Sequence, residues 1–407
     1  MMKQGKSGSG RPPWRRKRRS SSRGRGGRPG GRSGEGLENG PQKPQQVTGV
    51  LEVMSDKSGY LRKASNGYFA ENGDVFVNSD LIHRNQLRPG VEIKGEATFA
   101  KGKLRLRTIE SVMSLSLEEF QQFEPFGRLV CIDPIERLEI DLGNDPNLRI
   151  IDLITPIGRG QRSLIVAPPR TGKTIILKKL AQAIVEFHPE IHLMVVLIDE
   201  RPEEVTDFKR SVDAEVVYSS NDEPASKHVR VVEMVLERSR RMIEAGKDVV
   251  LLLDSLTRVA RAYNNQTKDR GRTLSGGLGA RSMEKPREFF GAARKIEDGG
   301  SLTIVATALV DTGSRMDDVI FEEFKGTGNM ELILHRGLAE KRVWPAIDIK
   351  KSGTRKEEKL RSEETQNKVN LVRRALASQS ADEALRILLS KIEKTESNSQ
   401  FLSLLKG

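Results

Sequence analysis

The chain has 407 residues, of which 36% are hydrophobic and 31% are charged, a composition typical of a soluble globular protein with two or three domains. Its apolar runs are too short to span a bilayer, and no apolar stretch follows the basic N-terminus, which excludes a secretory signal. The single cysteine, Cys131, excludes an internal disulfide framework and is typical of a protein in a reducing cytoplasm.

Residues 1–46 are predicted to form a disordered basic tail. They contain 13 lysines and arginines against only Glu35 and Glu38, so most of the net charge of +13 lies in this segment. The segment has too few apolar residues to offset the entropy of an ordered chain. Its basic run at 15–19 suits non-specific contact with nucleic-acid phosphates, and the alternative is a tail that only improves solubility.

Residues 47–112 are predicted to form a small closed barrel. Alternating apolar residues indicate five strands, at 47–53, 60–63, 74–77, 91–97 and 104–109. Asn-Gly and Pro-Gly pairs mark the turns, at 66–67, 72–73 and 89–90. Five strands in so short a stretch favour the oligonucleotide-binding (OB) fold.

Two of these strands carry candidate residues for binding single-stranded nucleic acid. The stretches around Tyr60 and Phe76 resemble the two nucleic-acid-binding strands of cold-shock domains. Both rings would present faces on which bases can stack, with Arg62 and Asp74 beside them. The alternative is that the two rings belong to the barrel core.

Residues 113–127 are predicted to form a connector and residues 128–355 an α/β domain. Apolar runs indicate buried strands at 164–167, 191–198, 248–253 and 301–310, separated by helical stretches such as 229–245 and 286–296. Strands that alternate with helices imply parallel pairing with right-handed crossovers. Ligands of such sheets bind at the carboxyl ends of the strands.

The turn after the first of these strands has the pattern of a phosphate-binding loop. Its residues are Pro169, Arg170, Thr171, Gly172, Lys173 and Thr174. A loop that ends in Gly-Lys-Thr before a helix presents backbone N–H groups to phosphate oxygens. Lys173 can reach the β- and γ-phosphates of ATP, and the Thr174 hydroxyl can bind Mg²⁺. Ala167 stands where the usual pattern begins with Gly, and the alternative is an ordinary strand–helix turn.

Two acidic residues follow other strands of this sheet. Asp254 is a candidate acid that holds Mg²⁺ through water, and Glu200 is a candidate catalytic residue that orients or deprotonates the attacking water. Glu203 and Glu204 are alternatives to Glu200. A surface carboxylate paired with Arg201 is the other interpretation of Glu200.

Two Gly-rich segments complete the predicted α/β domain. One spans residues 273–279 and follows the basic run 268–272, and the other spans 311–315. Both can place backbone N–H groups, with Arg272 or Arg315, against phosphates in a central channel. They can equally be simple flexible loops.

Residues 356–407 are predicted to be a C-terminal helical part of the same α/β domain. Ser380 and Glu383 form a capping box ahead of an apolar stripe. The stripe comprises Leu385, Ile387, Leu388, Leu389 and Ile392. It is most simply core or subunit contact.

From about residue 47 to its end the chain resembles the Rho family of bacterial transcription termination factors. The segments that carry the resemblance are 156–162, 167–174, 198–205, 222–226, 289–294, 323–331 and 352–358. The resemblance implies a homohexameric ring with a RecA-like motor, which uses ATP and Mg²⁺ to move along RNA as a helicase. It also implies a cold-shock-like domain for primary RNA binding, and RNA polymerase with elongation factors as partners.

The resemblance also implies roles for individual residues. The catalytic Glu falls on Glu200, the Mg²⁺-associated Asp on Asp254, a regulatory arginine on Arg201 and an arginine finger on Arg355. The two channel loops fall on Arg272, Leu274, Ser275, Gly276, Gly277, Thr312, Gly313, Ser314 and Arg315. For the finger, Arg336 and Arg342 are the other candidates beyond the fourth strand.

Two departures from the family pattern affect these expectations. Family members usually begin with a small helical bundle, where this chain has its basic tail. Ser58 stands where the family often has a further aromatic residue. Two other functions compete with an RNA-dependent motor: a rotary or secretion-type hexameric ATPase with a structural barrel, and an RNA-binding protein with an inactive motor.

Overall fold

A computed structural model describes residues 43–141, 145–266, 277–279 and 281–405. Most of the predicted basic tail lies outside these residues. So do the predicted channel residues Arg272, Leu274, Ser275 and Gly276. From Lys43 onward the chain forms one compact unit.

The first part of this unit is a closed five-stranded barrel, as predicted. Its strands are β1 (Gln45–Val53), β2 (Gly59–Arg62), β3 (Val75–Val77), β4 (Glu92–Ala100) and β5 (Lys103–Val112), in the order β1-β2-β3-β5-β4. Helix α1 (Ser79–Arg84) follows β3 and was not predicted. Helix α2 (Leu117–Gln121) lies in the predicted connector and starts at a Ser116 capping box.

The second part is built on a sheet of nine described strands. They are β6 (Cys131–Ile132), β7 (Arg162–Ala167), β8 (His192–Glu200), β9 (Glu215–Ser220), β10 (Asp248–Asp254), β11 (Arg294–Ile296), β12 (Ser301–Leu309), β13 (Met330–Ile333) and β14 (Gly353–Thr354). The main order is β14-β13-β7-β12-β10-β8-β9, and the six strands from β13 to β9 pair in parallel. Parallel pairing confirms the expected α/β motor fold, and long apolar runs form its strands because both faces are buried.

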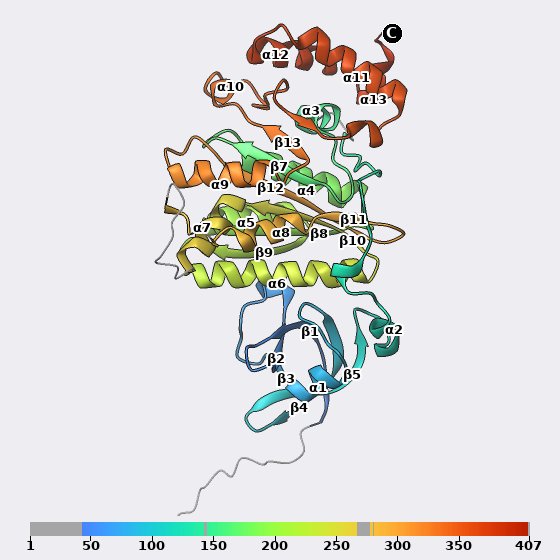
Figure 1. Ribbon diagram of the computed structural model, residues 1–407, viewed down its shortest axis with the longest axis vertical. Coiled ribbons are helices and arrows are strands. Elements are labelled where there is room, and N and C mark those ends of the chain that lie inside the picture. Colours follow the sequence, from blue (N-terminus) through green and yellow to red (C-terminus); the bar gives the residue numbers. More distant parts are fainter. Residues whose placement is uncertain (1–42, 142–144, 267–276, 280, 406–407) are drawn as a thin grey trace, which may run out of the picture. The chain divides into compact units, whose positions relative to one another are not determined.

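Helices cover both faces of this sheet (Figure 1). They are α3 (Pro146–Ile154), α4 (Lys173–Phe187), α5 (Pro202–Ser211), α6 (Ala225–Glu244), α7 (Leu256–Gln266), α8 (Glu284–Gly291), α9 (Arg315–Lys325) and α10 (Arg336–Glu340). The chain ends in α11 (Glu363–Leu376), α12 (Ala381–Ile392) and α13 (Asn398–Ser403). The predicted capping box at the start of α12 is present.

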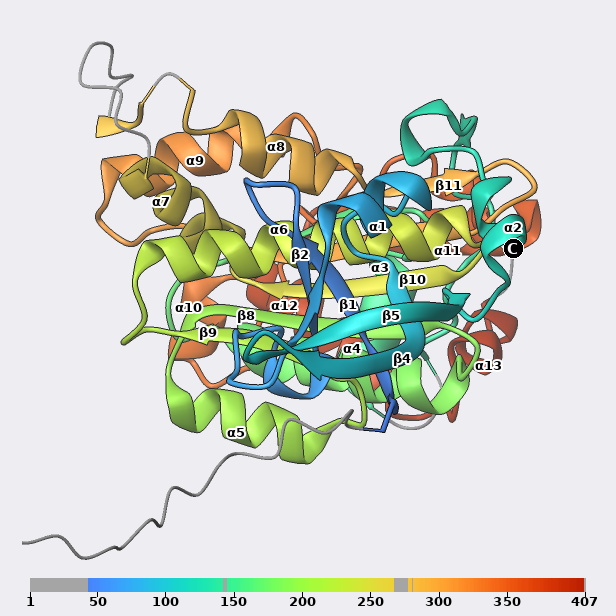
Figure 2. The same cartoon turned by 90° about the horizontal axis from the view of Figure 1, so that it is seen from below.

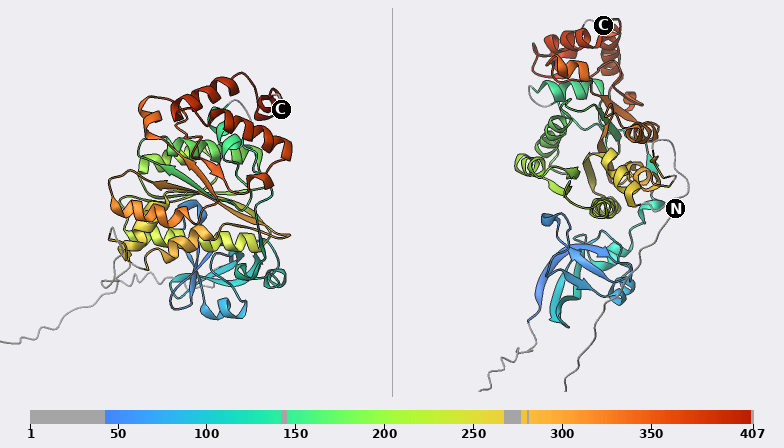
Figure 3. Two further views of the ribbon diagram at one scale, coloured as in Figure 1. Left: turned by 45° about the horizontal axis from the view of Figure 1, so that its top comes forward. Right: turned by 90° about the vertical axis from the view of Figure 1, so that its left-hand side faces the viewer.

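Alternation along the strands divides the motor core into two layers. In β7, Leu164 and Val166 join the layer formed with α6 to α9, whereas Ile165 and Ala167 join the layer formed with α3 to α5 and α11 to α13. Figure 3 shows the sheet between these two groups of helices. Successive strand side chains point to opposite faces, so each strand contributes to both layers.

The barrel packs against α6 (Figures 1 and 2). Gly90 has a φ of +85°, and a Cβ at this position would lie 2.3 Å from the backbone carbonyl carbon of Glu237 in α6. Only glycine permits both this conformation and this close approach. The barrel core and the motor layer on the α6 side form one continuous apolar cluster.

One predicted helix is wrong in its second half. The helix expected over 286–296 ends at Gly291, and Arg294–Ile296 is strand β11. Lys295 pairs with both Ser301 and Ile132, so a tight hairpin on β12 overrides the local helical pattern. Strands β9 and β13 were also not predicted.

Candidate functional site

The turn between β7 and α4 folds as a phosphate-binding loop would. Gly172 is the N-cap of α4 with a φ of +86°, so the first N–H groups of a 15-residue helix point out of the turn. The Thr171 hydroxyl donates a hydrogen bond to the Pro168 carbonyl at 2.7 Å and closes the loop. Pro169 and Arg170 are exposed, and Thr174 lies in the first turn of α4.

Three of the predicted catalytic side chains lie together at the carboxyl ends of three strands. The Lys173 ammonium is 2.5 Å from Asp254 Oδ2 and 3.3 Å from Glu200 Oε1. Glu200 and Asp254 are 3% and 1% exposed, so the two carboxylates are buried and share one cation. The sequence alternative, in which Glu200 is a surface carboxylate, does not describe this geometry.

Burial and charge act in opposite directions on these groups. Burial raises the pKa of Glu200, and the Asp254 carboxylate raises it further, against the opposing charges of Lys173 and Arg258. Burial alone would lower the pKa of Lys173, but the two neighbouring carboxylates outweigh it and raise that pKa. Lys173 therefore stays an ammonium ion, while Glu200 is a better proton acceptor than an exposed glutamate.

Two polar residues at this site were missed from the sequence. Arg258 of α7 lies 3.4 Å from Glu200 Oε1 and 3.5 Å from Asp199 Oδ2. The Thr307 hydroxyl of β12 donates to Asp254 Oδ1 at 2.8 Å. Neither belongs to a recognisable local motif, so only the parallel order of the strands could have indicated them.

An aromatic residue beside the loop was also missed. A Cβ at Gly172 would lie 3.1 Å from the ring of Trp344, so the indole lies against the start of α4. Trp344 is 41% exposed, which is unusual for so large an apolar side chain. The arrangement leaves a flat apolar surface next to the phosphate-binding loop.

Two predicted catalytic arginines lie apart from the Lys173 cluster. Arg201 is exposed at the start of α5, one residue after Glu200. Arg355 follows β14, and its backbone N–H donates to the Asn329 carbonyl at 2.8 Å, ahead of β13. Glu357, two residues after Arg355, lies 3.6 Å from Arg361 and 3.4 Å from Arg373.

On the barrel, the predicted aromatic pair lies on neighbouring strands. Tyr60 and Phe76 are paired in register, and their ring centroids are 5.5 Å apart in an edge-to-face arrangement. Both rings are only partly buried, which favours an exposed stacking surface over the core alternative. The Arg62 guanidinium lies 4.9 Å from the Tyr60 centroid, but Arg62 and Asp74 are both buried and form an ion pair with each other.

Strand β5 adds cations to this face that sequence reasoning missed. The Lys103 ammonium lies 5.4 Å from the Phe76 centroid, and the Arg105 guanidinium lies 4.8 Å from it. A cavity of about 680 Å³ is lined by Tyr60, Lys103 and Phe99, whose ring is 53% exposed. The basic residues that alternate with leucines in 103–107 could have indicated this cationic face from the sequence.

The described parts of the two predicted channel segments lie next to each other. A Cβ at Gly277 would lie 3.8 Å from Met316, which follows the segment 312–315. The Thr312 hydroxyl donates to buried Asp317 at 2.6 Å, and Arg261 of α7 donates to the same carboxylate at 2.8 Å. Gly313 and Arg315 are exposed, and Ser314 is partly buried.

Comparison with known proteins places these features in a family. Residues 47–119 match the Rho termination factor RNA-binding domain, and residues 147–354 match the nucleotide-binding domain of the ATP synthase alpha/beta family. Transcription termination factor Rho of Borreliella burgdorferi is 50% identical over 359 residues, which cover 87% of this chain and 70% of that protein. Rho of Pseudomonas aeruginosa is 48% identical over 365 residues, or 88% of this chain and 87% of the relative.

The chain belongs to the transcription termination factor Rho family. Its two matched domains make it an ATP-hydrolysing enzyme with a Rho-type RNA-binding domain. This assignment favours a termination factor over the rotary or secretion-type alternative.

Solved structures of other ATPases share the Rho-family motor fold. An ATPase of the type III secretion system of pathogenic bacteria is 22% identical with a TM-score of 0.58, covering 73% of this chain and 90% of that one. An ATP synthase subunit of Nanoarcheaum equitans is 16% identical with a TM-score of 0.53, covering 67% of this chain and 76% of that one. At these identities the likeness concerns the fold alone. Among the described helices, none is long and apolar enough to cross a membrane.

The donors at the Rho-family nucleotide site fit an Mg²⁺ ion that arrives with a nucleotide. Asp254 is engaged by Lys173 and Thr307, so it would reach the ion through water, and Thr174 lies in the first turn of α4, next to Lys173. No cluster of three metal-binding side chains occurs in the described ranges. Mg²⁺ usually keeps several waters and binds through one or two protein oxygens together with substrate phosphates.

Proposed function

We propose that this chain is an RNA-dependent ATPase and helicase that binds nascent single-stranded RNA, moves along it by hydrolysing ATP and ends transcription. The observation that carries the proposal is that an aromatic face surrounded by cations and a phosphate-binding motor occur in one Rho-family chain. Single-stranded RNA binds such faces by base stacking and by phosphate contacts.

At the nucleotide site, the chain's own residues have distinct tasks. The N–H groups at the start of α4 and the Lys173 ammonium would bind the phosphates of ATP, and Thr174 with Asp254 would hold Mg²⁺, which neutralises phosphate charge. Glu200 would take or orient the proton of the attacking water, helped by its raised pKa. The indole of Trp344 is placed to stack on the base.

Arg201, the neighbour of Glu200, is proposed to regulate this chemistry. It is exposed at the N-terminus of α5, where it can contact either an incoming phosphate or a neighbouring subunit. Its backbone is continuous with the Glu200 strand, so a movement of one residue affects the other.

Arg355 is proposed to act on the site of a neighbouring subunit in a homohexameric ring. The Asn329 side chain beside it accepts from the Arg162 backbone at 2.8 Å, at the amino end of β7. The phosphate-binding loop lies at the other end of β7. A strand rises about 3.3 Å per residue, so the two ends of β7 are roughly 17 Å apart. Arg355 is exposed and too far from its own subunit's loop, which supports action in trans.

RNA would contact two parts of the chain. The primary site comprises Tyr60, Phe76, Arg62 and Asp74, with the last two fixing the strands beneath the rings. The channel site comprises residues 272–277 and 312–315, and Gly277 lies next to Met316, which directly follows the second segment. Because nascent RNA emerges from RNA polymerase, that enzyme and its elongation factors are proposed partners, and the cytoplasm is the proposed location.

ATP hydrolysis measured with and without single-stranded RNA tests the proposal. We expect RNA to raise the rate several-fold, and single-stranded DNA or duplex RNA of equal length to do so less. A rate that is high and indifferent to RNA would favour a rotary or secretion-type ATPase. RNA binding without hydrolysis would favour an inactive motor.

A further inference from the structure

Helix α6 carries a row of charged residues along the side that faces the barrel. Three ion pairs join the helix to the barrel: Arg230 with Glu52, Arg238 with Glu92, and Glu244 with Arg88. Arg238 lies 2.7 Å from Glu92 Oε2, and Arg88 lies 2.9 Å from Glu244 Oε1. These pairs span most of the helix, so the barrel and α6 are expected to move as one body.

The C-terminal end of α6 also holds the connector between barrel and motor. Glu244 is 1% exposed in its side chain and accepts a hydrogen bond from the Phe126 backbone at 2.7 Å, in addition to Arg88. Arg241 lies 3.1 Å from the same carboxylate. The position of the connector is thus fixed by a buried carboxylate of α6.

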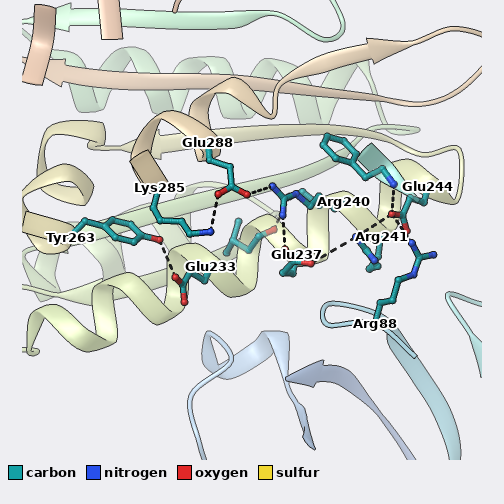
Figure 4. Close-up of polar contacts among 12 residues, drawn as sticks. Arg88, Glu233, Glu237, Arg240, Arg241, Glu244, Tyr263, Lys285 and Glu288 are labelled. Carbon is teal, nitrogen blue, oxygen red and sulfur yellow. Dashed lines mark hydrogen bonds and ion pairs between the residues drawn. The ribbon is translucent and has the colours of Figure 1, made fainter. Parts of the chain in front are cut away.

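The same face of α6 also contacts the two helices that flank the first channel segment, residues 272–277, in the sequence. Tyr263 of α7, just before this segment, donates to Glu233 of α6 at 3.5 Å. Glu288 of α8, just after it, is 2.8 Å from Arg240 of α6 and 2.8 Å from Lys285. Figure 4 shows these contacts continuing along α6 to Glu244 and Arg88.

Arg240 connects α6 to α8 within this row of charged residues. One terminal nitrogen lies 2.7 Å from Glu237 on α6, and the other lies 2.8 Å from Glu288 on α8. Its guanidinium is also 5.6 Å from the centroid of the Phe126 ring in the connector. A planar guanidinium presents its donors in a rigid geometry, whereas a lysine ammonium is a point charge on a flexible side chain.

The row has more than one possible pairing. Glu237 lies between Arg240 and Arg241, which is 3.8 Å away, and Arg241 lies between Glu237 and Glu244. Within the described residues, Nε of Arg240, Nε of Arg241 and Oε2 of Glu244 are buried without a hydrogen-bond partner. A partly satisfied buried network can exchange partners when one end is displaced, because no arrangement satisfies every group.

We propose that Arg240, through Glu288, is a positioning residue that couples RNA bound on the barrel to helix α8 and so to ATP hydrolysis. The coupling runs from the barrel and connector through α6 to α8. It rests on the proposed RNA-dependent activity. Arg240 touches neither nucleotide nor the stacking face, so its loss should leave both binding reactions intact.

The test uses the full chain with Arg240→Gln, Glu288→Gln and the double variant. Arg287→Gln is the matched control, because Arg287 also lies on α8 but pairs with Glu323 of α9. Three quantities are measured: the Kd of a short fluorescent single-stranded RNA, the ATPase rate without RNA, and the ATPase rate at saturating RNA. Arg240→Lys, which keeps the positive charge but lacks the planar guanidinium, completes the set of variants.

We expect the Kd and the RNA-free rate to stay within about twofold in all variants, while Arg240→Gln and Glu288→Gln lose at least about fivefold of RNA stimulation, the low end of allosteric coupling. The double variant should lose no more RNA stimulation than the single variants, because both substitutions break the same Arg240–Glu288 contact. Arg240→Lys should recover only part of the stimulation, and Arg287→Gln should behave as wild type.

Normal stimulation in both single variants would overturn the proposal. So would a parallel loss of thermal stability, RNA affinity and RNA-free rate, which would show that Arg240 only supports the fold. If the wild-type chain shows no RNA stimulation, the proposed function fails and the inference fails with it, an outcome visible before any variant is made.

Discussion

At the residue scale, Lys173 contacts two buried carboxylates, those of Asp254 and Glu200. Lys173→Ala is expected to abolish ATP hydrolysis, because it removes the cation for the phosphates and leaves the negative charges of Asp254 and Glu200 without their shared cation.

Glu200→Gln is expected to bind ATP but lose turnover by at least ~100-fold, as for loss of a positioned base. Steady-state hydrolysis and nucleotide binding check both, with thermal denaturation as the folding control. Near-normal turnover in Glu200→Gln would move the role to Glu203 or Glu204.

Arg258 provides a pH test of the same site. A base with a raised pKa is protonated and inactive at low pH, so turnover should fall as the pH falls through the pKa of Glu200. The positive charge of Arg258 opposes that increase in pKa. Arg258→Gln should therefore move the acidic limb of the pH–rate profile to higher pH. An unchanged limb, or one moved to lower pH, would mean that another group controls it.

The residues that the sequence predicts at this site share a local signal. Lys173 ends a Gly-Lys-Thr loop, and Glu200 and Asp254 each end a continuous apolar strand. Arg258 and Thr307 carry no such signal, because they reach the site only through the sheet order that sets β10 between β8 and β12. Their contribution is a property of tertiary packing and not of spacing along the chain.

At the element scale, the aromatic pair on β2 and β3 predicts where RNA binds. Phe76→Ala and Tyr60→Ala should each weaken single-stranded RNA binding by about 1–3 kcal/mol, the typical loss of one stacking surface. Phe69→Ala is the matched control, because its ring packs 5.9 Å from that of Tyr218 in the motor. Titration of a labelled oligonucleotide measures the effect. An equal loss of RNA affinity in the control, or unfolding of the variants without a change in intrinsic RNA affinity, would show that the two rings have only a structural role.

Element prediction succeeded where one periodicity dominated. The five barrel strands and the long apolar strands β8 and β12 have clear patterns, and all are present. The helix predicted over 286–296 fails because a local helical pattern cannot show that Lys295 pairs with Ser301 and Ile132. Strand β13 has only four residues and pairs with β7, which lies far away in the sequence, and β9 lies at the edge of the described sheet beside β8.

At the scale of the whole molecule, Arg355 predicts that activity depends on assembly. Arg355→Ala should reduce turnover by ~1,000-fold or more, as for other arginine fingers, with ATP affinity and assembly largely kept. Mixing Arg355→Ala subunits with Glu200→Gln subunits should restore some hydrolysis, because an intact Glu200 would sometimes face an intact Arg355. Hydrolysis as a function of mixing ratio measures the recovery.

Mixed rings must be shown to form, for example by mass spectrometry of differently tagged subunits. No recovery at any ratio in confirmed mixed rings would place Arg355 in its own subunit's site or outside catalysis. Arg336→Ala and Arg342→Ala are the comparison variants, because these residues are the other candidates for the role.

The continuous apolar cluster shared by the barrel and the α6 side of the motor also determines how the chain loses its structure. Two bodies that share a core should unfold in a single cooperative step. Urea titration followed by the fluorescence of Trp344 in the motor and by hydrogen exchange in β1 to β5 should therefore give one common midpoint. Separate midpoints would show that the barrel is an independent folding unit. A shared midpoint would mean that excising the barrel exposes an apolar face of each part, so that neither fragment retains the stability of the whole.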